Sequence, residues 1–161
     1  MSNASHLATL DMTLRVATVA DTSAVAAVYL LSRKTFLSYA PLAHTDAEVV
    51  DWLRHILIPT GQVYVMEQAT QVIGMMALSP ADSVRWIDQL YVHPDWVSQG
   101  VGSQFVRFAQ TVLSPPIRLY TFQANERSRR FYERHGFRAI AFTDGSDNEE
   151  CCPDVLYEWN L

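Results

Sequence analysis

The chain has 161 residues, of which 49% are hydrophobic and 18% are charged. This composition is typical of one globular domain and excludes a disordered polar chain. The formal net charge of −5 argues against nucleic acid as a main partner. No apolar run reaches the roughly 20 residues that span a bilayer. The two cysteines, Cys151 and Cys152, are adjacent and lack neighbouring ligands, so they predict neither a disulfide framework nor a metal site.

Residues 1–12 lack the charged start and the apolar core of a signal peptide. We expect them to form a disordered lead-in to a cytoplasmic protein, and two reduced thiols fit that compartment. No repeat, low-complexity tract or linker interrupts residues 13–161, which predicts a single domain. We expect no membrane partner. The oligomeric state stays open between a monomer and a homodimer.

Patterns of apolar residues divide the first half of the chain into five elements. Alternation or helical spacing predicts a strand at 13–19, helices at 22–37 and 46–57, and strands at 62–68 and 71–78. Pro59 and Gly61 end the second helix. Ala69 and Thr70 separate the last two strands and predict a hairpin between them.

In the second half, proline and glycine mark most of the boundaries. The pattern predicts strands at 83–94, 117–124, 137–142 and 154–160, and helices at 101–113 and 125–136. Gly136 stands where a left-handed residue commonly ends a helix. This order of elements predicts an α/β (α+β) fold in which a mixed sheet carries helices on both faces.

The turn at 97–103, just before the third predicted helix, contains Gly100 and Gly102. The first N–H groups of a helix have no partner within it, and the helix dipole adds positive charge there. Glycines let a ligand approach the bare backbone, so the turn predicts a phosphate or pyrophosphate site. Ser103 stands where a nucleoside triphosphate loop needs lysine, and Phe105 where a dinucleotide fingerprint needs glycine or alanine. Coenzyme A remains, as does the alternative that Gly100 simply allows a tight turn.

A second motif, "NERSRRFYERHGF" from Asn125 to Phe137, follows the next predicted strand. With the turn, it resembles the GNAT superfamily of acyl-CoA-dependent N-acyltransferases over nearly the whole chain. The family's patterns are Gln/Arg-x-x-Gly-x-Gly/Ala, which falls on 97–102, and Asn-x-x-Ala-x-x-Phe-Tyr-x-x-x-Gly-Phe, which falls on 125–137. Val97 departs from the first pattern, but a backbone N–H at that position is retained. The resemblance implies a largely antiparallel sheet of about seven strands, splayed around the fourth strand.

The resemblance also implies how acetyl-CoA would be held. Leu90, Tyr91 and Val92 would lie along the pantetheine arm, beside a bulge or splay near 89–91 that frees the strand's backbone groups. Asn125 would bond the pantetheine or fix a water, and Ser128 takes the small position of the second motif. Arg127 or Arg130 would contact the 3′-phosphate. The pyrophosphate would be held by the N–H groups of Val97, Ser98, Gln99, Gly100, Val101, Gly102 and Ser103.

Tyr132 is the candidate for protonating or hydrogen-bonding the thiolate that leaves when an amine attacks the thioester. Neighbours on a helix point about 100° apart, so we expect Phe131 in the core and Tyr132 in the site. Asp88 is the first candidate for the base that takes a proton from the amine. The alternatives are His44, His93, Glu149, Glu150 and water, and the aromatic residues Tyr39, Trp86 and Tyr91 are candidates for lining the acceptor pocket.

The sequence therefore predicts an N-acetyltransferase that moves an acetyl group from acetyl-CoA directly to a primary amine in a ternary complex. The acceptor stays open between a small molecule and a peptide or protein amine. No metal is required, and no covalent enzyme intermediate, since neither cysteine lies in the motifs. The alternative is a non-catalytic acyl-CoA-binding or sensing module on the same fold.

Overall fold

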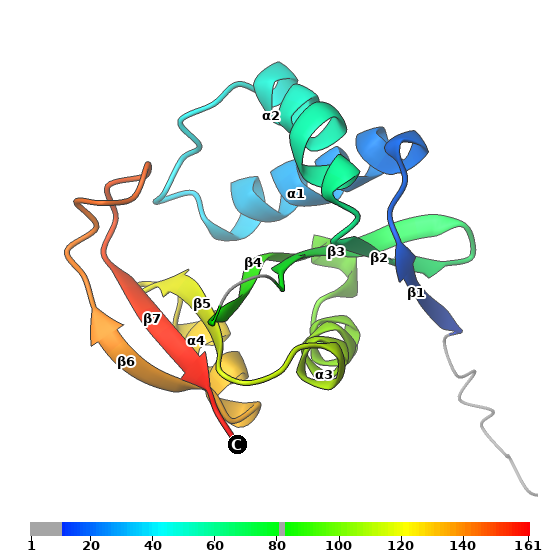
Figure 1. Ribbon diagram of the computed structural model, residues 1–161. Helices are drawn as coiled ribbons and strands as arrows, with labels where there is room; N and C mark the ends of the chain where they lie inside the picture. The colour runs from blue at the N-terminus through cyan, green and yellow to red at the C-terminus, as the bar shows by residue number, and fades with distance from the viewer. Residues whose placement is uncertain (1–10, 81–82) are drawn as a thin grey trace, which may run out of the picture.

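The computed structural model describes residues 11–80 and 83–161 (Figure 1). The strands are β1 (Met12–Val16), β2 (Val63–Gln68), β3 (Gln71–Ser79), β4 (Arg85–Val92), β5 (Ile117–Phe122), β6 (Arg138–Phe142) and β7 (Asp154–Trp159). The helices are α1 (Thr22–Phe36), α2 (Asp46–Trp52), α3 (Val101–Val112) and α4 (Glu126–Arg134). Shorter helical turns occupy Val19–Asp21, Leu53–Leu57, Ile58–Thr60 and Pro94–Trp96.

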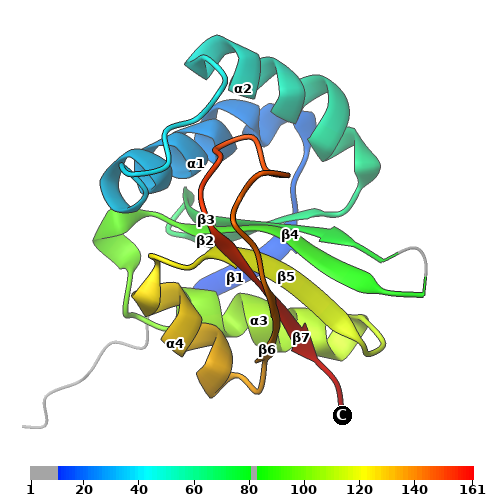
Figure 2. The ribbon, with the colours of Figure 1, turned by 90° about the vertical axis from the view of Figure 1, so that its left-hand side faces the viewer.

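The predicted fold class and element order are confirmed. One seven-stranded sheet has the order β1-β2-β3-β4-β5-β7-β6, and every neighbouring pair is antiparallel except β4 with β5. Figures 1 and 2 place α1 and α2 on one face of the sheet, and α3 and α4 on the other. No helix among the described residues combines the length and the apolar character that crossing a bilayer requires.

The N-terminal boundaries differ from the expected ones. Residues 1–10 of the expected lead-in lie outside the described residues, but Met12 is already the first residue of β1. That strand ends at Val16, not at Val19, because Asp21 accepts a hydrogen bond from the Thr18 N–H at 2.8 Å. Its carboxylate also pairs with Arg15 at 2.8 Å. These contacts fold residues 19–21 into a short helical turn before α1.

The sheet opens between β4 and β5, as the resemblance implied. The two strands pair only at Arg85 with Ile117 and at Trp86 with Arg118. On the other side of β4, Ala77 pairs with Gln89 and Leu78 with Ile87, so Asp88 is the extra residue of a β-bulge. Beyond this bulge β4 is paired with β3 but not with β5, which leaves one of its backbone edges free for a ligand.

Two apolar clusters fill the faces of the sheet. The cluster on the α3 side takes buried residues from both halves of the sheet, for example Met66 and Ile73 as well as Leu119 and Tyr157. The cluster on the α1 side takes its buried strand residues from β2 and β3, and none from β5, β6 or β7. A buried apolar core therefore joins the two halves of the sheet on the α3 face only, and on the α1 face the Tyr39 ring contacts the Phe122 ring of β5 at 6.1 Å.

Candidate active site

A pocket of about 730 Å³ lies where β4 separates from β5. It is lined by the expected cofactor-binding residues of β4, the glycine turn and α4, with two exceptions. The Gln99 side chain turns back and donates to the Asp95 carbonyl at 3.1 Å. Val101 is 1% exposed and packs in the core beneath the turn. A volume of this size suits a ligand as large as a nucleotide coenzyme.

The turn presents free N–H groups to this pocket. Gly100 caps α3 with φ +87°, and no side chain caps the helix, so its first N–H groups have no side-chain partner. A Cβ at Gly100 would meet nothing within 4 Å, so the backbone conformation alone requires glycine there. At Gly102, by contrast, a Cβ would lie 3.1 Å from the Phe131 ring. Gly102 is therefore small because α4 packs against it, which the sequence did not indicate.

The start of α4 forms the opposite wall. Asn125 Oδ1 accepts a hydrogen bond from the Ser128 N–H at 3.2 Å, so the side chain caps the helix while its NH₂ group remains available to a ligand. Arg127 donates to Ser98 Oγ at 2.9 Å and lies over the Phe36 ring at 5.5 Å. Arg130 does not line the pocket; it is exposed and lies 3.8 Å from Glu126.

Tyr132 lines the pocket and also belongs to the core, with 8% of its surface exposed. Its ring packs at 5.1 Å from Phe131 and 5.8 Å from Phe137. Burial raises the pKa of the Tyr132 phenol above its ordinary value. Within residues 11–80 and 83–161, Arg33 Nε is the only buried side-chain N or O atom that lacks a hydrogen-bond partner. The Tyr132 hydroxyl has no hydrogen-bond partner among the described residues and belongs to a side chain that lines the pocket.

Tyr132 lines the pocket as expected, but the expected placement of Phe131 in the core is wrong. Phe131 is only partly buried and lines the same pocket, whereas Tyr132 is the more deeply buried of the two. The pocket runs between the first turn of α3 and the length of α4, so adjacent positions on α4 border it. A separation of 100° does not remove either ring from a pocket that broad.

Asp88 does not line this pocket. It is exposed, hydrogen-bonds to the Ser79 hydroxyl, and lines a second pocket of about 440 Å³ farther along the opening between β4 and β5. Tyr91 lines both pockets, so it stands between them. Of the other expected acceptor residues, Tyr39 lines the first pocket, whereas Trp86 stacks on Tyr120 at 5.7 Å and lines neither.

The alternative side-chain bases also have partners, and only Glu150 among them lines the second pocket. Glu150 lines the second pocket and pairs with Arg33 at 3.1 Å. Glu149 lies 3.0 Å from His44, and this exposed contact borders neither pocket. His93 Nδ1 accepts from the Asp95 N–H at 3.1 Å. Asp88 is thus the carboxylate of the second pocket that lies on β4 itself, next to the free strand edge.

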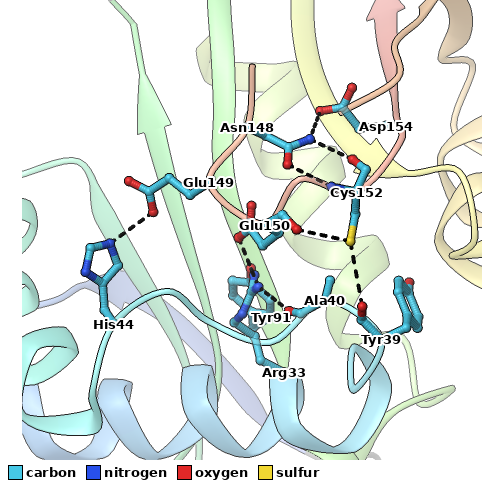
Figure 3. A network of polar contacts seen from close by, with 10 residues as sticks. All are labelled: Arg33, Tyr39, Ala40, His44, Tyr91, Asn148, Glu149, Glu150, Cys152 and Asp154. Carbon is cyan, nitrogen blue, oxygen red and sulfur yellow. Dashed lines mark hydrogen bonds and ion pairs between the residues drawn. The ribbon is translucent and has the colours of Figure 1, made fainter. Parts of the chain in front are cut away.

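Sequence reasoning missed Arg33. This α1 residue is 6% exposed, and its guanidinium donates to the Tyr91 hydroxyl at 3.0 Å, the Ala40 carbonyl at 3.1 Å and Glu150 at 3.1 Å (Figure 3). The signal was its spacing: Arg33 follows the buried Val25 and Tyr29 at steps of four, which places it on the apolar face of the helix.

The comparisons with known proteins agree with this fold. A family model described as an acetyltransferase (GNAT) domain matches residues 59–139. No curated protein matches the chain. Apo YjaB from Escherichia coli is similar in structure over 92% of this chain and 97% of its own, with 21% identity and a TM-score of 0.74.

Two further solved structures share the fold. PaiA N-acetyltransferase from Thermoplasma acidophilum, in complex with coenzyme A, is 16% identical, with coverages of 94% and 99% and a TM-score of 0.73. An acetyltransferase from Thermus thermophilus is 18% identical, with coverages of 94% and 98% and a TM-score of 0.74. Together with the matching family model, the open sheet and the glycine turn identify this chain as a member of the GNAT acetyltransferase family.

Proposed function

We propose that the protein transfers an acetyl group from acetyl-CoA directly to a primary amine. The observation that carries the proposal is one continuous pocket that joins the free N–H groups of α3, the free edge of β4 and the Tyr132 hydroxyl. The N-acetyltransferase from Thermoplasma acidophilum that shares this fold was solved with coenzyme A.

Two backbone features would hold the coenzyme. The N–H groups of Gly100 to Ser103 would bind the pyrophosphate, because the helix dipole favours an anion there. Leu90 and Val92 would pair with the pantetheine amides as a strand edge pairs with a peptide. Acetyl-CoA supplies the activated acyl group as a thioester.

One residue would act as the base for the amine, and another as the acid for the leaving thiolate. Asp88 would accept, through water, the proton that leaves the substrate ammonium. The free amine then forms the new C–N bond while the C–S bond breaks, and the nitrogen releases its second proton to water. Tyr132 would donate its proton to the leaving thiolate and recover it from solvent. The second pocket would admit the amine, because Asp88, Asp147 and Glu150 line it.

The test is an acetyl-CoA consumption assay with a panel of primary amines that includes a diamine, an arylalkylamine, an amino acid amide and a peptide. We expect acetylated product from at least one of them. Thermal shift with coenzyme A alone, measured in parallel, separates two failures. Binding without transfer to any amine would indicate a non-catalytic acyl-CoA-binding module, and absence of binding would reject the site itself.

Arg127 is expected to contact the 3′-phosphate of the coenzyme, since it lies at the pocket wall beside Ser98. Arg127→Met should raise the Kd for coenzyme A about fivefold, which corresponds to ~1 kcal/mol for an exposed charge contact. The same variant should bind 3′-dephospho-CoA as the parent does. Arg130→Met provides the comparison, and isothermal titration measures the Kd of each variant for both ligands. An equal loss of affinity for both ligands would mean that Arg127 does not contact the 3′-phosphate.

A further inference from the structure

We propose that Arg33 is a positioning residue for the acceptor amine: it clamps the loop at 143–153 against α1 and holds Tyr91 at the boundary between the two pockets. Its assignment to the acceptor rests on the proposed function. The clamp itself is a property of the folded chain, so the two can be tested separately.

The clamp joins three parts of the chain through one guanidinium. Arg33 donates from α1 to Tyr91 on β4 at 3.0 Å, to Glu150 in the loop between β6 and β7 at 3.1 Å, and to the Ala40 carbonyl after α1 at 3.1 Å (Figure 3). Arginine suits this place because its planar group carries five donors in fixed directions, which a lysine ammonium cannot reproduce.

The loop is fixed at its base by contacts of its own. Asn148 donates to the Cys152 carbonyl at 2.7 Å and to Asp154 at 3.1 Å. The hydroxyl of Thr143 binds the same Asp154 carboxylate. These contacts shape the loop, but none of them reaches α1. Glu150 is therefore the point at which a buried side chain of α1 holds the loop.

On the α1 side, no apolar core holds the loop against the helix. The cluster there contains no buried residue from β5, β6 or β7. The other polar contacts between the loop and the α1–α2 region, among the described residues, are the exposed His44–Glu149 pair and the contact of Cys152 Sγ with the Tyr39 carbonyl at 3.7 Å. The Arg33–Glu150 side chains are only 7% and 17% exposed, against 49% and 70% for His44–Glu149. A buried pair is screened little by water, so it is the stronger restraint.

The clamped residues are also those that border the second pocket. Arg33, Tyr91 and Glu150 all line it, together with Asp88. Tyr91 is held from two sides, by the hydrogen bond from Arg33 and by the Tyr29 ring at 4.8 Å. Release of Glu150 would free the loop wall, and loss of Arg33 would also leave Tyr91 without its polar partner. We therefore expect the acceptor to bind more weakly, while the glycine turn of the coenzyme pocket, which lies on the α3 side, is unaffected.

The experiment compares Arg33→Met and Glu150→Gln with Lys34→Met. Lys34 is the next residue on α1 and makes an exposed ion pair with Asp46 at 2.9 Å, so it matches Arg33 in charge and helix position but lies outside both pockets. Kinetics are measured with the amine that gives the highest turnover in the panel. Both clamp variants should raise KM for that amine about tenfold and change KM for acetyl-CoA less than twofold, and Lys34→Met should change neither.

Hydrogen exchange of the unliganded proteins tests the clamp without any substrate. Amides in 143–153 should exchange about tenfold faster in Arg33→Met and Glu150→Gln than in the parent or in Lys34→Met. If Arg33→Met does not fold, Glu150→Gln decides the outcome. Unchanged exchange overturns the clamp. Faster exchange with an unchanged amine KM, or with a lower kcat alone, overturns the role in acceptor binding. If the parent acetylates no amine, the proposed function fails, and the exchange result still decides on the clamp.

Discussion

Replacing Tyr132 by phenylalanine is expected to lower kcat by about 100-fold or more, the range typical of a lost general acid. The ring should keep its packing against Phe131 and Phe137, since phenylalanine removes only the hydroxyl. That hydroxyl has no hydrogen-bond partner among the described residues, so its loss should leave the melting temperature close to the parent's. A large kinetic effect on an intact fold is the signature of a catalytic residue.

Steady-state kinetics measure the change in kcat, and thermal shift with coenzyme A measures the melting temperature. The pH profile adds a second check. Because burial raises the pKa of the Tyr132 phenol above its ordinary value of about 10, the proton stays bound at neutral and mildly alkaline pH. The kcat of the parent should therefore not fall between pH 7 and about pH 10 through loss of this proton. Full turnover by Tyr132→Phe would remove Tyr132 from the mechanism.

Gly145→Ala is expected to destabilise the protein by about 3 kcal/mol or more, which exceeds the effect of alanine at the other glycines with a positive φ. Gly145 has φ +82°, and a Cβ there would lie 2.8 Å from the Cys152 nitrogen and closer still to the Cys152 carbonyl group. The neighbour is backbone, which cannot move aside as a side-chain tip can. The loop at 143–153 must therefore change its path, and the melting temperature should fall by roughly 10 °C.

Gly61→Ala is the matched control. Gly61 has φ +74°, but a Cβ there would meet nothing within 4 Å. It should show the backbone penalty alone, ~1–2 kcal/mol, and a correspondingly smaller fall in melting temperature. Differential scanning calorimetry of both variants separates the two contributions. Equal losses would mean that the loop accommodates the extra methyl group without rearrangement.

The sequence was sufficient for the order of the strands and helices and for the glycine turn, because both depend on local chemistry. The turn around Gly100 combines a positive φ with a helix start, and glycine is the residue type that favours such a position. Alternation and helical spacing likewise predicted every strand and every main helix in order. These patterns are set by neighbours in the chain.

What the sequence could not predict depends on residues far apart. The partners of Arg33 lie at positions 40, 91 and 150, and no local sequence pattern indicates that these positions are in contact with Arg33. Asp88 and Tyr132 were assigned to one site, but the bulge and the splay direct them to different pockets. The proximity of Phe131 to Gly102 is also a tertiary contact between α3 and α4.

The unequal packing on the two sides of the sheet has a mechanical consequence. Only two residue pairs fasten β4 to β5, and the apolar core that bridges the two halves lies on the α3 side. The two halves of the sheet are thus held together by an apolar core on the α3 side and by polar contacts of the loop at 143–153 on the α1 side. Loss of the polar contacts on the α1 side is therefore expected to loosen the loop at 143–153, while the apolar core on the α3 side keeps the two halves of the sheet together.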